Sequence, residues 1–323
     1  MTFPRCNLIW RFLLATLLAL CLASGISSAP VRAQPKSDIW APALSLLLPG
    51  FDQWWEQDYG AAAAYSGMWL GGNALAVSGL KALQGRQDLS GSDRLSSRDG
   101  DVRRAMLGSQ MAFAAGSYST LHAFRNAVDS RREFGQYSFL GEKVTVQDTV
   151  MAPFHFSYLK SPNTYIPLGL IGALAVYTSQ SHTEGYERVA LRNSDVAFGG
   201  AFSYLAGTHE EALFRGWMMP LMREYVVGDT MSNVSQSLLF ALAHRSTVAV
   251  PIPQLLLGYH LGYVTQQNGW SLGEAVFIHT WWDIFAFLAS YSQKEIDQGA
   301  SQRIGRTVFK TPVLNLPPLS LVF

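Results

Sequence analysis

An all-α fold, a polytopic membrane helical bundle, is predicted by three features of this sequence of 323 residues. Hydrophobic residues make up 49% of the chain and charged residues only 15%, whereas charged residues are about a quarter of a typical globular protein. The apolar residues are gathered in several long segments with polar stretches between them. Three apolar segments of the C-terminal half also carry ionisable side chains, which are costly at membrane depth. We therefore expect the functional motifs on C-terminal transmembrane helices.

Residues 1–33 have the pattern of a secretory signal peptide. Arg5 and Arg11 precede an apolar run at 12–23, and the small-residue sequence at 31–33 offers a cleavage site. The run is too short for an ordinary spanning helix, and an uncleaved signal anchor is the alternative. Both cysteines of the chain lie in this segment. A cleaved chain would therefore have no thiol for a disulfide, a nucleophile or a metal ligand.

The N-terminal half is predicted to contribute membrane spans and polar loops. Gly67 and Gly71, in the first span, would permit the close approach of another helix. Residues 84–104 contain interspersed basic and acidic side chains and are interpreted as a solvated loop. Two segments are interpreted as helical spans, 60–83 and 105–124, and a third apolar segment follows at 165–178. Shorter apolar pieces are expected at the membrane interface: 41–50 and 152–162.

Two carboxylates and an arginine lie within the first of four helices predicted in the C-terminal half. Glu211 and Arg215 are four residues apart, so they share one helix face and can pair. Glu210 is turned by roughly 100° from Glu211 and is left to face another helix. The four predicted helices are at about 195–222, 231–249, 252–267 and 271–291.

Two later apolar helices offer partners for Glu210. The second helix of this half carries Phe240-Ala-Leu-Ala-His244. The last carries His279-Thr-Trp-Trp-Asp283, in which an imidazole and a carboxylate are one helical turn apart. Inward polar groups on three apolar helices predict one hydrated site within the bundle.

These three motifs, EExxxR, FxxxH and HxxxN-or-D, resemble those of the CAAX-protease and bacteriocin-processing family of intramembrane proteases. This family is also called the Abi or type II CAAX prenyl endopeptidase family. The resemblance covers roughly residues 195–291, and three motifs in this order and spacing are fairly specific. It implies an intramembrane endopeptidase for membrane-associated or lipid-modified substrates. Together with the bacterial-style signal sequence at 1–33, it leads us to expect a multi-pass protein of a bacterial inner membrane. The implied partners are a peptide or protein substrate and the lipid bilayer, and a net charge of +1 gives no indication of nucleic acid.

Peptide hydrolysis requires an activated water, a base for its proton and donors for the oxyanion. Glu210 is the candidate base, because Glu211 is expected to be occupied by Arg215. His244 would orient the water or bind the oxyanion. Asp283, where asparagine is the more common family residue, would fix the tautomer of His279 or contact the water directly. The candidate catalytic residues are Glu210, Glu211, Arg215, His244, His279 and Asp283.

No cofactor is assigned, although a divalent metal such as zinc is an alternative to a metal-free glutamate protease. Glu210, His244 and His279 would then be the ligands, with a fourth position open for water. Two other functional classes also fit the motifs: a catalytically silent membrane scaffold or immunity protein of the same fold, and a membrane transporter.

The predicted organisation follows from these assignments. It comprises a signal peptide at 1–33, an N-terminal membrane region at 34–190, an intramembrane protease core at 191–292 and a C-terminal tail at 293–323.

Overall fold

Helices make up nearly all of the computed structural model of the chain. The structure describes residues 36–84, 98–141, 144–180, 186–225, 228–244 and 251–295. The predicted signal peptide at 1–33 lies outside these ranges, as does all of the predicted tail beyond residue 295. In the described part of the chain, the prediction of an all-α fold is confirmed, since the strands amount to one short antiparallel pair.

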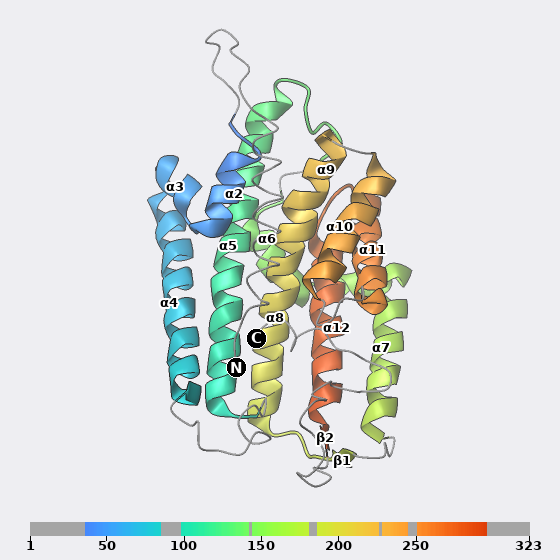
Figure 1. The fold of residues 1–323 in the computed structure, drawn as a ribbon. Coiled ribbons are helices and arrows are strands. Elements are labelled where there is room, and N and C mark those ends of the chain that lie inside the picture. Colours follow the sequence, from blue (N-terminus) through green and yellow to red (C-terminus); the bar gives the residue numbers. More distant parts are fainter. Residues whose placement is uncertain are drawn as a thin grey trace.

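The N-terminal half provides two long helices and several short ones (Figure 1). They are α2 (Trp40–Leu47), α3 (Phe51–Trp55), α4 (Tyr59–Gln84), α5 (Gly100–Arg132), α6 (Val146–Met151), the 3-10 turns η1 (Ala152–Phe154) and η2 (Phe156–Lys160), and α7 (Pro162–Gln180).

The C-terminal half follows as α8 (Asn193–Leu213), the π-helical turn η3 (Phe214–Met218), α9 (Met219–Tyr225), α10 (Asp229–Ala243), α11 (Ile252–Gln267) and α12 (Gly273–Tyr291). The strands β1 (Tyr186–Arg188) and β2 (Gln293–Glu295) pair at one end of the bundle (Figure 1). Among the helices of the described ranges, none combines the length and the apolar character that a membrane crossing requires.

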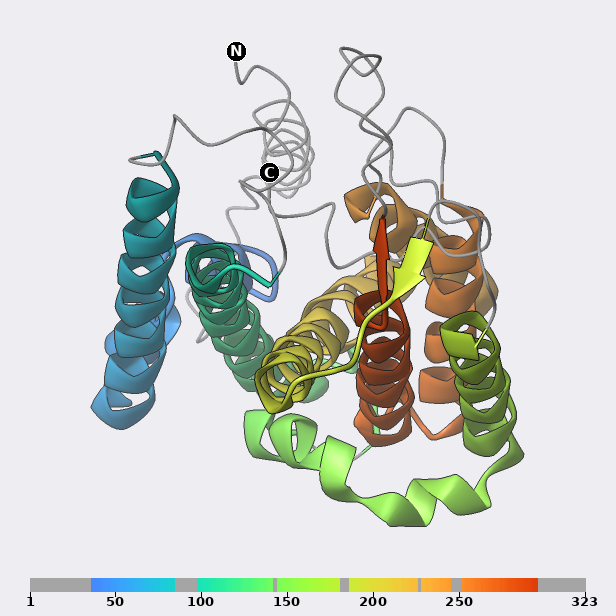
Figure 2. The same cartoon turned by 90° about the horizontal axis from the view of Figure 1, so that it is seen from below.

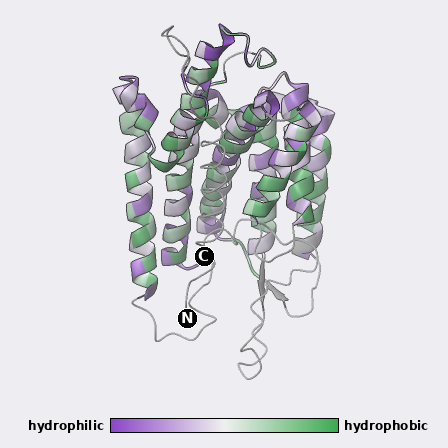
Figure 3. Ribbon diagram, turned by 45° about the horizontal axis from the view of Figure 1, so that its top comes forward, coloured by the Kyte–Doolittle hydropathy of each residue, from purple (hydrophilic) through white to green (hydrophobic). Residues whose placement is uncertain are grey.

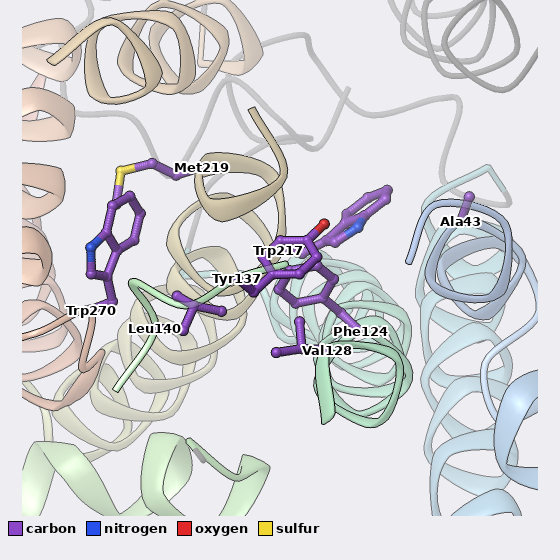
Figure 4. Packing of buried hydrophobic residues seen from close by; sticks show 8 residues of the cluster. All are labelled: Ala43, Phe124, Val128, Tyr137, Leu140, Trp217, Met219 and Trp270. Carbon is purple, nitrogen blue, oxygen red and sulfur yellow. The ribbon is translucent and has the colours of Figure 1, made fainter. Parts of the chain in front are cut away.

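The central helix of the bundle is α8, which packs between α5 and α12. Figure 2 shows this arrangement from below, with α4 at the outer edge beside α5, and with the segment from α6 to η2 crossing one side towards α7. An apolar cluster joins α2, α5 and the π turn at the other end of the molecule (Figure 4). Its buried members are Ala43, Phe124, Val128, Tyr137, Leu140, Trp217, Met219 and Trp270.

The predicted end of the loop at residue 104 is wrong, because α5 already begins at Gly100. The Asp99 side chain caps this helix by accepting hydrogen bonds from the backbone N–H groups of Asp101 and Val102. Arg103 pairs with Asp195 at the start of α8. Of the charged residues that indicated a loop, those from Asp99 onwards therefore cap and start a helix and join it to its neighbour.

Close contact between α4 and α5 depends on glycines other than the two predicted. A β-carbon on Gly72 would lie 2.7 Å from the backbone nitrogen of Ala112, and one on Gly79 would lie 2.5 Å from the carbonyl oxygen of Asp101. No atom lies within 4 Å of the corresponding position at Gly67 or Gly71. The sequence reveals small residues, but not which of them faces the partner helix.

Gly207 allows α8 to approach α12 where both helices carry site residues. A β-carbon there would lie 2.7 Å from both Cα and N of Thr280, which are backbone atoms that cannot move independently. We expect Gly207→Ala to force the helices apart and to lower the free energy of unfolding by about 1–3 kcal/mol, measured by thermal unfolding in detergent. Gly200→Ala, where no atom lies within 4 Å, is the matched control and should be neutral or stabilising. Equal losses in the two variants would contradict this explanation.

Candidate active site

The two adjacent glutamates lie at the end of α8, directly before the π-helical turn. The N–H of Phe214 faces the carbonyl oxygens of both Glu210 and Glu211 where the helix widens. Such turns are rare and are frequently found at functional sites. This one contains Arg215, whose Nη1 donates to Glu211 Oε1 at 2.7 Å, so the pairing that the spacing allows is formed.

Glu211 and Arg215 together connect α8 and the π turn with α11 and α12. Glu211 Oε1 also accepts from His279 Nδ1 of α12 at 2.7 Å, while Arg215 Nη2 donates to the Gly258 carbonyl oxygen of α11 at 2.8 Å. Because a carboxylate oxygen only accepts, the bond places a proton on Nδ1 of His279. Glu211 therefore fixes the His279 tautomer, which is one of the two roles predicted for Asp283.

Glu210 faces both histidines. Its Oε2 atom lies 3.3 Å from His244 Nε2 and 3.8 Å from His279 Nε2. The Nδ1 atom of His244 donates to the Phe240 carbonyl oxygen at 2.7 Å, so Nε2 of this ring is directed at Glu210. The structure thus brings Glu210, His244 and His279 together from α8, the end of α10 and α12.

Helix α10 ends at Ala243, earlier than the predicted end at 249. The reason is local. In a continuing helix, the Phe240 carbonyl would accept a hydrogen bond from the backbone N–H of His244. Here it accepts one from the His244 ring instead. That N–H donates to the Ala241 carbonyl at 3.1 Å. The end of the helix and the orientation of the imidazole are therefore one feature.

Phe240 provides an aromatic wall for the site. Its ring centroid lies 4.4 Å from that of His244 and 5.6 Å from that of His279. The Arg215 guanidinium carbon lies 4.6 Å from the same centroid, within the range of a cation–π contact. One apolar side chain thus contacts a cation and both imidazoles and limits their movement.

All the candidate residues of the site are buried, but not to the same degree. Glu211 and Arg215 have no exposed area, whereas Glu210, His244 and Asp283 are 6%, 8% and 8% exposed. Glu211 and Arg215 are thus the fully enclosed pair of the site, and what exposure remains belongs to Glu210, His244 and Asp283.

Several acceptors converge around Glu210 Oε2. With Nδ1 protonated, each neutral imidazole presents its Nε2 lone pair to Glu210 Oε2. Asp283 Oδ2 lies 3.6 Å from His279 Nε2 and adds a further acceptor. Such an arrangement is favourable only with protons on the rings or with a hydrogen-bond donor shared among them. It is therefore suited to binding and deprotonating a small donor such as water.

The arrangement suits a metal ion less well than it suits water. Within the described ranges, no group of three or more His, Cys, Asp or Glu side chains is placed so that it could hold a metal ion. Glu210, His244 and His279, the predicted ligand set, therefore do not form such a group.

Polar residues of α10 that no motif indicated support the site from behind. Gln236 Nε2 donates to the Gly258 carbonyl oxygen at 3.2 Å, beside Arg215, and to Asn233 Oδ1 at 2.8 Å. The sequence does contain a signal for them, since polar side chains recur at helical spacing along one face of this otherwise apolar helix. They are Ser232, Asn233, Gln236 and Ser237.

No curated protein and no solved structure matches the chain. Residues 192–285 match the family model described as Type II CAAX prenyl endopeptidase Rce1-like, and this segment contains all six candidate catalytic residues. The family recognised from the three motifs is thereby confirmed. Over residues 192–285 the chain is similar to the Rce1-like type II CAAX prenyl endopeptidase family.

Proposed function

We propose that this chain is an intramembrane endopeptidase that hydrolyses peptide bonds of membrane-associated or lipid-modified substrates in a bacterial inner membrane. The observation that carries the proposal is the position of Glu210 Oε2 within 3.8 Å of the Nε2 atoms of both His244 and His279. The family match to an endopeptidase supports it.

The proposed reaction starts with water bound between Glu210 Oε2 and the two imidazoles. Glu210 removes a proton from the water, and the resulting hydroxide attacks the carbonyl carbon of the scissile peptide bond. A protonated Nε2 of His244 or His279 donates to the oxygen that becomes negative. As the tetrahedral intermediate collapses and the C–N bond breaks, Glu210 returns its proton to the leaving amine.

The remaining residues position these groups. Glu211 holds His279 through Nδ1, and Arg215 neutralises the charge of Glu211. Asp283 lies on the Nε2 side of His279, so it favours a proton on that atom or contacts the water directly.

Apolar surface on the outer helices supports the proposed membrane location. Helix α4 has no charged residue before Lys81, and α7 has none along its length. Large apolar side chains on these helices face outwards, with Leu70 60% and Leu170 67% exposed. Figure 3 shows apolar residues along the outer helix at the left of the picture, which is α4. Contact of such apolar surface with lipid has no free-energy cost, whereas its exposure to water is unfavourable.

The function is tested by comparing the membrane proteomes of cells that contain either the wild-type protein or Glu210→Gln at equal abundance. We expect new N- and C-termini, generated by cleavage of membrane proteins, only in the wild-type cells, because glutamine cannot accept the proton of water.

Two outcomes would overturn the proposal. Identical termini in both strains would leave a catalytically silent scaffold. A solute flux into sealed vesicles that depends on the protein, without any change in termini, would indicate a transporter.

A further inference from the structure

We infer that Gln110 of α5 is a positioning residue for Glu210, acting through the hydrogen bond that it makes with His209. The inference rests on the proposed peptidase function and extends it to a helix outside the matched segment 192–285. None of the sequence motifs includes α5.

His209, the residue before Glu210, is held by one face of α5. Its Nε2 atom lies 2.7 Å from Gln110 Oε1, and its Nδ1 atom lies 3.4 Å from Ser117 Oγ. Since an amide oxygen accepts, Nε2 carries the proton, and Nδ1 can accept from the serine hydroxyl. Phe113 stacks on the imidazole with the ring centroids 6.5 Å apart. All three contacts come from positions 110, 113 and 117, which share a helix face.

These groups are enclosed in the interior. Gln110 is 5% exposed, Ser117 1% and His209 6%. A buried hydrogen bond between groups that water cannot reach is costly to lose, because neither partner finds a replacement. The Gln110–His209 bond is therefore a firm connection between α5 and α8.

A second bond strengthens the same connection. Tyr118 of α5 and Thr208 of α8 are joined by their hydroxyl oxygens at 2.5 Å. Two consecutive residues of α8, Thr208 and His209, are thus bonded to α5. The next two, Glu210 and Glu211, face His244 and His279 on the other helices.

These contacts, made by successive residues to opposite sides, fix the rotation of α8 about its own axis. Successive residues of a helix are about 100° apart, so holding His209 against α5 sets the direction of Glu210. Glu210 has to point between two imidazoles, and a misplacement of about 1 Å can cost a catalyst up to 100-fold in rate. Without its acceptor on α5, His209 would no longer define that rotation.

The test compares purified variants in detergent with an internally quenched peptide that carries a farnesylated cysteine and a CAAX ending. Gln110→Leu removes the acceptor and keeps the volume. We expect it to lower kcat by about tenfold with KM within about twofold, the effect of losing one positioning hydrogen bond. Gln110→Glu keeps an acceptor oxygen in the same place and should restore kcat to within about threefold of the wild type.

A matched control separates positioning from general stability. Gln53 is also buried and also bonds to α5, through Ser119, but on the side of α2 and α3. Gln53→Leu should lower the melting temperature as much as Gln110→Leu while leaving kcat unchanged. If Gln110→Leu does not fold, Gln110→Asn provides the same comparison, because its shorter side chain withdraws the oxygen from His209.

The outcomes distinguish this inference from the function on which it rests. A kcat for Gln110→Leu equal to that of Gln53→Leu, or no recovery in Gln110→Glu, would overturn the positioning role while Glu210→Gln still abolished cleavage. If Glu210→Gln behaves as the wild type, the peptidase proposal itself fails. Where the farnesylated peptide is not cleaved, the same variants are compared by the rate at which product termini appear in cell membranes after induction.

Discussion

Purified protein carrying Glu210→Gln is expected to cleave the quenched peptide about 10²–10⁴-fold more slowly than the wild type, which is the usual contribution of a general base. Glutamine fills the same volume but has no site for the proton of water. KM should change little, because no group that contacts the rest of the peptide is altered. The measurement is a steady-state determination of kcat and KM at matched detergent and protein concentrations.

Two further arms make this expectation specific. Glu210→Asp keeps a carboxylate but shortens its reach to the imidazoles, so its kcat should lie between those of the wild type and Glu210→Gln. Wild-type activity should persist after dialysis against EDTA. Activity lost on chelation and restored by zinc would instead establish Glu210, His244 and His279 as metal ligands. Full activity in Glu210→Gln would remove this residue from the mechanism.

The helices were predictable because each long apolar segment forms one. The residues at which the helices begin and end were less predictable. Asp99 and the arginines after it look the same in a sequence whether they belong to a solvated loop or begin a helix that pairs with Asp195. The end of α10 was also hidden, because it depends on a ring nitrogen of His244 replacing a backbone donor.

The candidate site was predictable where its contacts are local. Glu211 and Arg215 are four residues apart, so helical geometry alone places them together. The bond from Glu211 to His279 spans 68 residues and depends on how α8 and α12 are rotated against each other. The same is true of Gln110 and His209, 99 residues apart. Neither pairing follows from the periodicity of its own helix.

Replacing Arg215 by methionine is expected to lower the free energy of unfolding by about 3–5 kcal/mol, the cost of breaking a buried ion pair by removing one partner. Arg215 and Glu211 have no exposed area, so water cannot solvate the carboxylate that remains. The Gly258 carbonyl would also lose its donor at 2.8 Å, although Gln236 would still donate to it. Unfolding of the purified variant by heat or denaturant in detergent measures the change.

The double variant Glu211→Gln/Arg215→Met tests whether the loss arises from the unpaired charge. It removes the charge together with its partner, and neutral replacements of buried pairs are often well tolerated. It should therefore be more stable than Arg215→Met alone. Arg223→Met is the matched surface control, since its partner Asp229 is 60% exposed and such pairs contribute about 1 kcal/mol or less. A double variant no more stable than Arg215→Met would show that the guanidinium acts through its packing on Phe240 and its bond to Gly258, and not through Glu211.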